Sequence, residues 1–324
     1  MSSWNRIQVS AVCMLFGLTI LALPAAAEDP KPTTSQPRRQ KLPEGINVER
    51  DLAYDSHGKS NTLDLYLPEK ATAPLPLVIW IHGGAWIAGN KDDGGPAIRL
   101  LPFGYATASI NYRLSNEAIY PAQIEDCKAA MRFLRANAKK YNLDPDHFGV
   151  WGASAGGHLV ALLGTTGDVK ELEGSGPHLD VSSRVQAVCD LFGPTDLAKI
   201  ASQSGPEIVM KHDAPDSPEA KLIGGPIQDN PEKAAKANPI TYVSKSAAPF
   251  LILHGDKDPL VPAEQSRILH EALQKAGVES TLVIVKGAGH GPGLDTPQYF
   301  QQVVDFFDRH LRTEKPTSGD QSVK

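Results

Sequence analysis

The chain has 324 residues, of which 41% are hydrophobic and 21% are charged, and its formal net charge is −5. This length is enough for one large α/β domain or two small ones, and the composition is ordinary for a globular protein. The mild acidity and the lack of a long basic run argue against nucleic acid as a partner, because phosphates are bound by clustered lysines and arginines.

The first residues are typical of a signal peptide. Arg6 supplies a positive charge, Val9–Leu23 is apolar, and Pro24 is followed by a small-residue cleavage site at Ala25–Ala27. The apolar stretch is short for a membrane-spanning helix, which needs about 20 residues. We therefore expect residues 1–27 to be removed, leaving a secreted or periplasmic protein without a membrane span; an uncleaved anchor is the alternative.

Two polar segments frame the expected domain. Residues 28–45 are polar and rich in proline, and residues 313–324 are polar as well. Such composition predicts a disordered linker before the domain and a disordered tail after it. One folded domain is accordingly expected over residues 46–312.

Strand and helix signals alternate through this domain. The first strand, 62–67, alternates apolar and polar residues as a half-buried antiparallel strand would, and the second, 75–81, is almost wholly apolar, as a strand buried on both faces would be. Further strands are expected at 105–112, 147–151, 185–191, 250–254 and 280–285, with helices at 124–141, 155–164, 263–276 and 297–311. This alternation predicts a mostly parallel sheet with helices on both faces.

Residues 195–246 are the least regular part of the domain and are rich in proline, glycine and charge. The segment is too long for a simple connection, so it predicts a lid or cap over a site. Among the cysteines, Cys127 and Cys189 remain once the signal peptide is removed. Because an exported protein meets oxidising conditions, these two cysteines could form a disulfide. Two buried free thiols are an equally weighted alternative.

The stretch 152–156, GASAG, fits the pattern G-x-S-x-G. It follows an expected strand and precedes an expected helix, which is the setting of a nucleophile elbow, a sharp turn that exposes the serine hydroxyl. Serine is a weak nucleophile by itself and needs a base that a third group orients. Ser154 is therefore the candidate nucleophile.

The base is expected after the serine in the chain. Gly287–Gly291, GAGHG, is a glycine-rich loop after the last strand, where His290 can face the carboxyl edge of the sheet. His270 and His310 lie inside expected helices, and His254 ends a strand, where packing or hydrogen bonding explains it better. The other candidates after Ser154 are His178 and His212.

The acid is expected on the loop 254–262, HGDKDPLVP, after the penultimate strand. A carboxylate there can hold the imidazole in one tautomer. We favour Asp258 as this buried carboxylate, and assign Asp256, closer to the strand end, to pinning the turn as an Asx cap.

Two backbone amides must stabilise the oxyanion that forms during acyl transfer. The N–H of Ala155, directly after the nucleophile, is expected to be one. The other is expected from Gly83 or Gly84 in HGGAW (82–86), which follows the strand 75–81. Trp86 is expected to line the acyl or alcohol pocket, with a role in the core as the alternative.

With these residues in place, the chain resembles the α/β-hydrolase esterases related to bifunctional feruloyl and acetyl xylan esterases, within the wider acetyl-esterase/lipase group. The resemblance covers residues 54–311 and is carried by HGGAW (82–86), NYRL (111–114), YPAQIEDCKAAMRFLRANA (120–138), GASAGGHLV (152–160), HGDKDPLVP (254–262) and GAGHG (287–291). It implies an eight-stranded α/β-hydrolase fold and a Ser154–Asp258–His290 triad. Ala85 replaces the third glycine of the lipase-type HGGG motif, which leaves the second oxyanion donor open.

The activity that the resemblance implies is hydrolysis of short-chain acyl or aryl esters, such as acetyl or feruloyl groups on plant-type carbohydrates, without a metal or organic cofactor. A small-molecule or carbohydrate ester is the expected partner, and the sequence leaves the oligomeric state open. Two alternatives are a peptidase or amidase of the prolyl-oligopeptidase kind and a non-catalytic binding module. The chain lacks the long N-terminal region that forms a propeller in the former, and it retains all three triad residues that binding modules generally lose.

Overall fold

The computed structural model describes residues 42–92 and 94–312, and the chain separates into two compact units, 1–36 and 37–324. The first unit, and with it the predicted signal peptide, lies outside the described residues, as do most of the expected linker and the expected tail. Residues 42–45 are the part of the expected linker that is described, and they contact the fold: Glu69 N–H donates to Gly45 O at 2.9 Å, and Leu42 packs beside Tyr66. The expected linker is therefore ordered at its last four residues.

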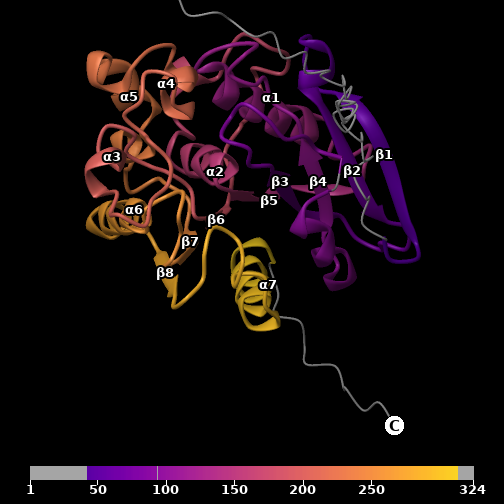
Figure 1. The fold of residues 1–324 in the computed structure, drawn as a ribbon. Coiled ribbons are helices and arrows are strands. Elements are labelled where there is room, and N and C mark those ends of the chain that lie inside the picture. The colour runs from indigo at the N-terminus through magenta and orange to yellow at the C-terminus, as the bar shows by residue number, and fades with distance from the viewer. Residues whose placement is uncertain (1–41, 93, 313–324) are drawn as a thin grey trace, which may run out of the picture. The chain divides into compact units, whose positions relative to one another are not determined.

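The predicted mostly parallel sheet with helices on both faces is confirmed (Figure 1). In the described residues it has eight strands in the order β1-β2-β4-β3-β5-β6-β7-β8, of which β2 is antiparallel to both β1 and β4 and all other pairs are parallel. The strands are β1 Ile46–Ala53, β2 Thr62–Pro68, β3 Leu75–Ile81, β4 Ala106–Ile110, β5 Leu143–Ala153, β6 Ala187–Leu191, β7 Phe250–Gly255 and β8 Ser280–Val285.

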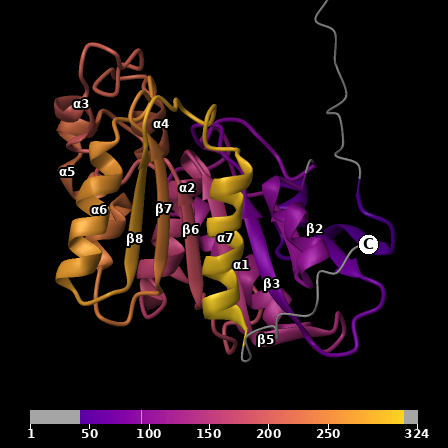
Figure 2. The same ribbon diagram turned by 90° about the horizontal axis from the view of Figure 1, so that it is seen from below.

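The α-helices are α1 Ala122–Ala136, α2 Ala155–Thr165, α3 Ile200–Gln203, α4 Pro218–Ile223, α5 Pro231–Ala237, α6 Glu264–Lys275 and α7 Pro297–Leu311. Short 3₁₀ helices are η1 Gly58–Asn61, η2 Pro96–Phe103, η3 Lys170–Leu172, η4 Ile227–Asp229 and η5 Pro239–Tyr242. The sheet separates two hydrophobic clusters. Helices α1, α2 and α6 pack on one face of the sheet, and α7 and η2 pack on the other. Figure 2 shows α7 in front of the sheet, running in about the same direction as strands β6 and β7.

The first two strands differ from what the sequence predicted. Strand β1 was not predicted, because its sequence INVERDLA is largely exposed and carries charges, as an edge strand tolerates. Strand β2 is buried on both faces rather than on one. The reason is Asp64, which is 1% exposed and forms an ion pair with Lys91 Nζ at 2.6 Å, so that a polar position in the pattern lies inside the protein.

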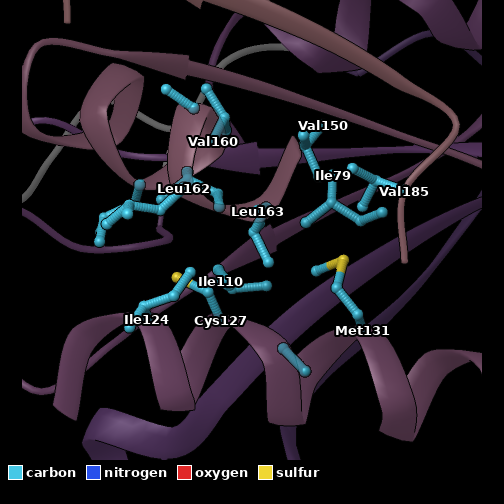
Figure 3. Packing of buried hydrophobic residues seen from close by; sticks show 14 of the residues in the cluster. Ile79, Ile110, Ile124, Cys127, Met131, Val150, Val160, Leu162, Leu163 and Val185 are labelled. Atoms are coloured by element: carbon cyan, nitrogen blue, oxygen red, sulfur yellow. The ribbon is translucent and has the colours of Figure 1, made fainter. Parts of the chain in front are cut away.

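The two cysteines of the domain are free and buried. Cys127, on α1, faces the cluster between α1, α2 and the sheet (Figure 3), whereas Cys189, on β6, belongs to the cluster on the opposite face. A disulfide cannot join thiols that the sheet separates. The alternative of two buried thiols is the observed one.

Burial leads to a simple prediction for these thiols. Both should resist iodoacetamide in the folded protein, because burial raises the pKa of each thiol well above its usual value and the thiolate is the reactive form. Both should become alkylated on unfolding in guanidinium, which peptide mass spectrometry can follow at each cysteine. Rapid alkylation of either residue in native buffer would contradict the packing described.

Candidate active site

The parallel strands bring five loops to one edge of the sheet. Ile81 in β3 is level with Gly152 in β5, and Gly152 is level with Asp190 in β6. At the same edge, Gly255 of β7 is level with Val285 of β8. The predicted nucleophile, acid and base loops, which lie far apart in the sequence, therefore meet at the carboxyl edge of the sheet.

Ser154 lies in the turn between β5 and α2, with φ 56° and ψ −121°. A non-glycine residue in this region is strained, by about 1–3 kcal/mol, and such strain is typical of functional sites. The turn is tight because Gly156 approaches β3 closely: a Cβ on Gly156 would lie 2.0 Å from Ile81 O. Close packing therefore requires glycine at position 156 of the motif. The strained turn places the Ser154 side chain at the start of α2.

The predicted acid and base contact each other. His290 Nδ1 lies 2.7 Å from Asp258 Oδ2, and the Asp258 side chain is 1% exposed. Because the carboxylate accepts the Nδ1 proton, the imidazole keeps its Nε2 lone pair for a proton from the nucleophile. Ser154 and His290 line one cavity, although no hydrogen bond joins them in the described structure. Such bonds are often long until substrate is bound.

Four polar contacts hold Asp258, including the one with His290. Its Oδ1 accepts from the backbone N–H groups of Leu260 and Val261 at 2.8 and 2.9 Å, and its Oδ2 also contacts His254 Nε2 at 3.2 Å. Burial alone would raise the pKa of Asp258, but the hydrogen bonds from His254 and His290 outweigh it and hold the pKa well below its usual value. The carboxylate therefore stays ionised, as an orienting group must.

The other histidines and the other aspartate that the sequence offered as base or acid have different positions or contacts. His254 is buried and hydrogen-bonded, as the sequence suggested, with Nδ1 2.7 Å from Ser266 Oγ. Asp256 is exposed and does not cap its own turn: it accepts a hydrogen bond from Gly287 N–H, at 2.6 Å, and so anchors the loop that carries His290. His178 is exposed, and His270 and His310 are partly buried on α6 and α7.

The loop after β3 approaches Ser154 closely. A Cβ on Gly83 would lie 2.8 Å from Ala153 O and 3.3 Å from Ser154 Cβ. Gly84, Ala85 and Trp86 all have positive φ, and Gly84 O accepts from the N–H groups of Ile87 and Ala88, both at 3.0 Å. Within the described chain, the N–H groups of Gly83, Gly84 and Ala155 donate to no other residue. The loop therefore offers amides beside the start of α2.

Residues of the NYRL stretch support this loop. Tyr112 donates to His82 O at 3.0 Å, and its ring stacks on that of His82 with centroids 4.4 Å apart. Arg113 forms a bidentate ion pair with buried Asp126 of α1, which fixes the chain just after Tyr112. In the sequence these residues were notable only for the family resemblance; in the structure they support the loop after β3.

The cavity beside Ser154 has a volume of about 340 Å³. It is lined by Gly84, Ala85, Trp86, Ser154, Ala155, Phe192, Pro194, Met210, Pro218, Glu219, Leu260, Val261 and His290. Trp86 is both a cavity residue and a core residue, because it is 2% exposed and packs edge-on against His158 with centroids 5.2 Å apart. The segment predicted as a lid supplies Met210, Pro218 and Glu219 to the wall.

Phe192 and Glu219 are among the cavity residues that the sequence did not predict. Phe192, directly after β6, has φ 45°, and its ring lies 4.4 Å from that of His290, so it packs against the base. Its position after a strand and before Gly193 and Pro194 was an available signal. Glu219 lies in an irregular segment and gave no such signal.

From Asp190, the next-to-last residue of β6, we predict a pH-dependent stability. It is fully buried, and burial raises its pKa from 3.8 to about 6, although a hydrogen bond from Gly193 N–H opposes the shift. Its contribution to stability is therefore present below pH 4 and lost as the pH rises through 6. Relative to Asp190→Asn, the wild type should lose about 2 kcal/mol of unfolding free energy between pH 4.5 and 8.

Urea unfolding at a series of pH values measures this difference directly. The asparagine can still accept from Gly193 N–H through its amide oxygen, so the variant preserves the local bond. A difference between the two proteins that stays constant with pH would show that Asp190 does not titrate in this way.

Residues 63–273 match the BD-FAE family. The chain belongs to this family. The region that matches BD-FAE contains Ser154 and Asp258, whereas His290 follows its end. A further finding is that no helix among the residues described here is both long and apolar enough to cross a membrane.

Individual proteins similar to this BD-FAE chain are esterases. Esterase LipQ of Mycobacterium tuberculosis is 35% identical over 231 residues, 70% of this chain and 53% of LipQ. The structure of a truncated carbohydrate esterase from gut microbiota is 39% identical, with a TM-score of 0.77, and the match covers 83% of this chain and 99% of that one. A bifunctional GH43-CE protein of Bacteroides eggerthii is also 39% identical, with a TM-score of 0.75 over 82% of this chain and 35% of that one.

These similarities confirm the α/β-hydrolase fold and the resemblance to carbohydrate esterases. The BD-FAE chain spans about half the length of LipQ.

Proposed function

We propose that this chain is a serine carboxylic ester hydrolase that acts through Ser154, His290 and Asp258. The observation that carries the proposal is the 2.7 Å contact between His290 Nδ1 and the buried Asp258 carboxylate, at a cavity that Ser154 also lines. The membership of the BD-FAE family and the similarity to esterases support it.

The proposed reaction has two steps and uses these three residues in both. His290 Nε2 takes the proton of Ser154 Oγ as the oxygen attacks the ester carbonyl carbon, and a tetrahedral oxyanion forms. The oxyanion collapses, the bond to the alcohol breaks, and His290 returns the proton to the departing oxygen. Water then attacks the acyl-enzyme by the same route, releasing the acid and restoring Ser154. Asp258 stabilises the imidazolium in both steps.

The backbone amides proposed to bind the oxyanion lie at the start of α2 and in the loop after β3. Ala155 N–H follows the nucleophile directly, and its position at a helix N-terminus favours negative charge. Gly83 or Gly84 supplies the second amide, because this loop lies against the Ser154 turn. Ala85, where lipases have a third glycine, has φ 53° and so keeps a backbone conformation that glycine adopts readily.

The proposed substrates are carbohydrates that carry short acyl or aryl esters, such as acetyl or feruloyl groups. One similar solved structure is described as a carbohydrate esterase. A cavity of about 340 Å³ is at the lower end of small-molecule sites. Trp86 is proposed to contact the substrate, and residues 195–246 to act as the lid.

A substrate panel tests this proposal. Acetylated and feruloylated xylo-oligosaccharides, p-nitrophenyl acetate and a proline-containing peptide amide should be compared by kcat/KM. The proposal predicts hydrolysis of the esters and a far slower reaction with the amide. A preference for the amide would instead support a peptidase of the prolyl-oligopeptidase kind, and no hydrolysis at all would support a binding module.

We further propose that the protein is secreted or periplasmic after cleavage following Ala27. The apolar stretch at 9–23 and the alanines before Glu28 support this proposal. N-terminal sequencing of the protein recovered from the exported fraction tests it. Recovery of the uncleaved chain in the membrane fraction would indicate an anchor.

A further inference from the structure

Glu219 is a buried carboxyl group in the wall of the proposed catalytic cavity. It belongs to α4, in the segment predicted as a lid, and is 2% exposed. The cavity that it lines is also lined by Ser154 and His290. Its Oε1 lies 2.8 Å from His212 Nδ1, whereas its Oε2 is buried with no hydrogen-bond partner among the described residues.

The contact with His212 fixes what Oε2 can do. His212 Nε2 lies 2.9 Å from Leu260 O, and a carbonyl oxygen only accepts, so Nε2 must carry a proton. One further proton then lies between His212 Nδ1 and Glu219 Oε1, on either partner. In both arrangements Oε2 carries no proton, so it is an acceptor.

The same contacts hold Glu219 in place relative to the triad. Leu260, which accepts from His212, donates its own N–H to Asp258 Oδ1 at 2.8 Å. Glu219 is therefore tied through two residues to the loop that positions His290. We assign the alcohol half of the substrate to this side of the cavity, because in the proposed reaction His290, which is held by the same loop, returns its proton to the departing alcohol.

An acceptor buried without a partner is costly and rare in native proteins, and it calls for a specific explanation. A ligand group that donates to Oε2 would remove this cost. We propose that Glu219 recognises a hydroxyl group on the alcohol half of the substrate, next to the scissile ester, as a pyranose sugar carries. This inference rests on the proposed esterase function, and makes Glu219 a specificity-determining residue for polyol esters.

Two substrates that differ in one hydroxyl test the proposal on the wild-type protein. These are trans-2-hydroxycyclohexyl acetate and cyclohexyl acetate, each rate being divided by the rate of alkaline hydrolysis of the same ester. A site built to bind a hydroxyl rejects the analogue that lacks it, so the normalised kcat/KM should favour the hydroxy ester by about 10- to 100-fold. A ratio near one would overturn the proposal.

Two variants at position 219 separate recognition from packing. Glu219→Met removes the acceptor at similar length, and the hydroxy-to-deoxy ratio should fall to about one. Glu219→Gln can donate its amide to His212 Nδ1 and still present an oxygen at the position of Oε2, so the ratio should be largely retained. The exposed Glu232 of α5 provides the matched control, Glu232→Met, which should keep the wild-type ratio.

The outcomes distinguish this inference from the proposed function. An unchanged ratio in Glu219→Met, with a folded protein by thermal melting, overturns the inference while ester hydrolysis stands. Loss of selectivity in both variants would also overturn it, because the oxygen acceptor alone would not explain recognition. If the wild type hydrolyses neither cyclohexyl ester nor p-nitrophenyl acetate, the proposed function itself fails.

Discussion

Replacing Ser154 by alanine is expected to lower kcat for p-nitrophenyl acetate by at least roughly 10³-fold, because the acyl-enzyme can no longer form. Residual hydrolysis would come from the oxyanion amides and substrate binding, which the substitution leaves in place. The fold should persist, since the Ser154 side chain makes no cap hydrogen bond to α2. Steady-state kinetics with a thermal melt measure both.

The exposed Ser202 in α3 offers a matched control, since Ser202→Ala changes the same group away from the cavity and should keep wild-type kcat. Wild-type turnover in Ser154→Ala would contradict the assigned nucleophile.

Replacing Asp258 by asparagine should lower kcat by roughly 10³- to 10⁴-fold, with little change in KM. The carboxylate accepts the proton of His290 Nδ1 at 2.7 Å, and an amide that donates there favours the other tautomer, in which Nε2 cannot act as the base. The measurement is kcat at saturating p-nitrophenyl acetate, over a range of pH.

Asp256→Asn is the control from the same loop. The asparagine oxygen can still accept from Gly287 N–H, as Asp256 does, so this variant should stay within about tenfold of wild type. A larger loss at position 256 than at position 258 would reverse the assignment of the two aspartates.

The sequence was informative where local rules decide the structure. Strands β3, β8 and helix α7 have the predicted bounds because a buried apolar run and a helical period depend on few distant contacts. The contact of Asp258 with His290 could be anticipated from the order of motifs at strand ends, because parallel strands bring these ends to one edge.

Other features depend on contacts between distant segments and were not predictable. In the sequence, Asp64 is a polar residue that predicts an exposed face of the strand. It is buried because it forms an ion pair with Lys91, which comes from a later loop. Glu219 is positioned by His212, which in turn contacts Leu260, and these two residues lie in separate irregular segments. Asp256 in turn binds the His290 loop rather than its own turn, because the two loops lie side by side only after β7 and β8 pair.

The central claim is that Ser154 is the activated nucleophile of a triad with His290 and Asp258, and covalent labelling tests it most directly. A fluorophosphonate should modify the folded protein at one residue, and peptide mass spectrometry should place the added mass on Ser154. Labelling should be much slower in Asp258→Asn, because the base is then misoriented. Absence of labelling of the folded wild-type protein, or an adduct on a different residue, would contradict the account.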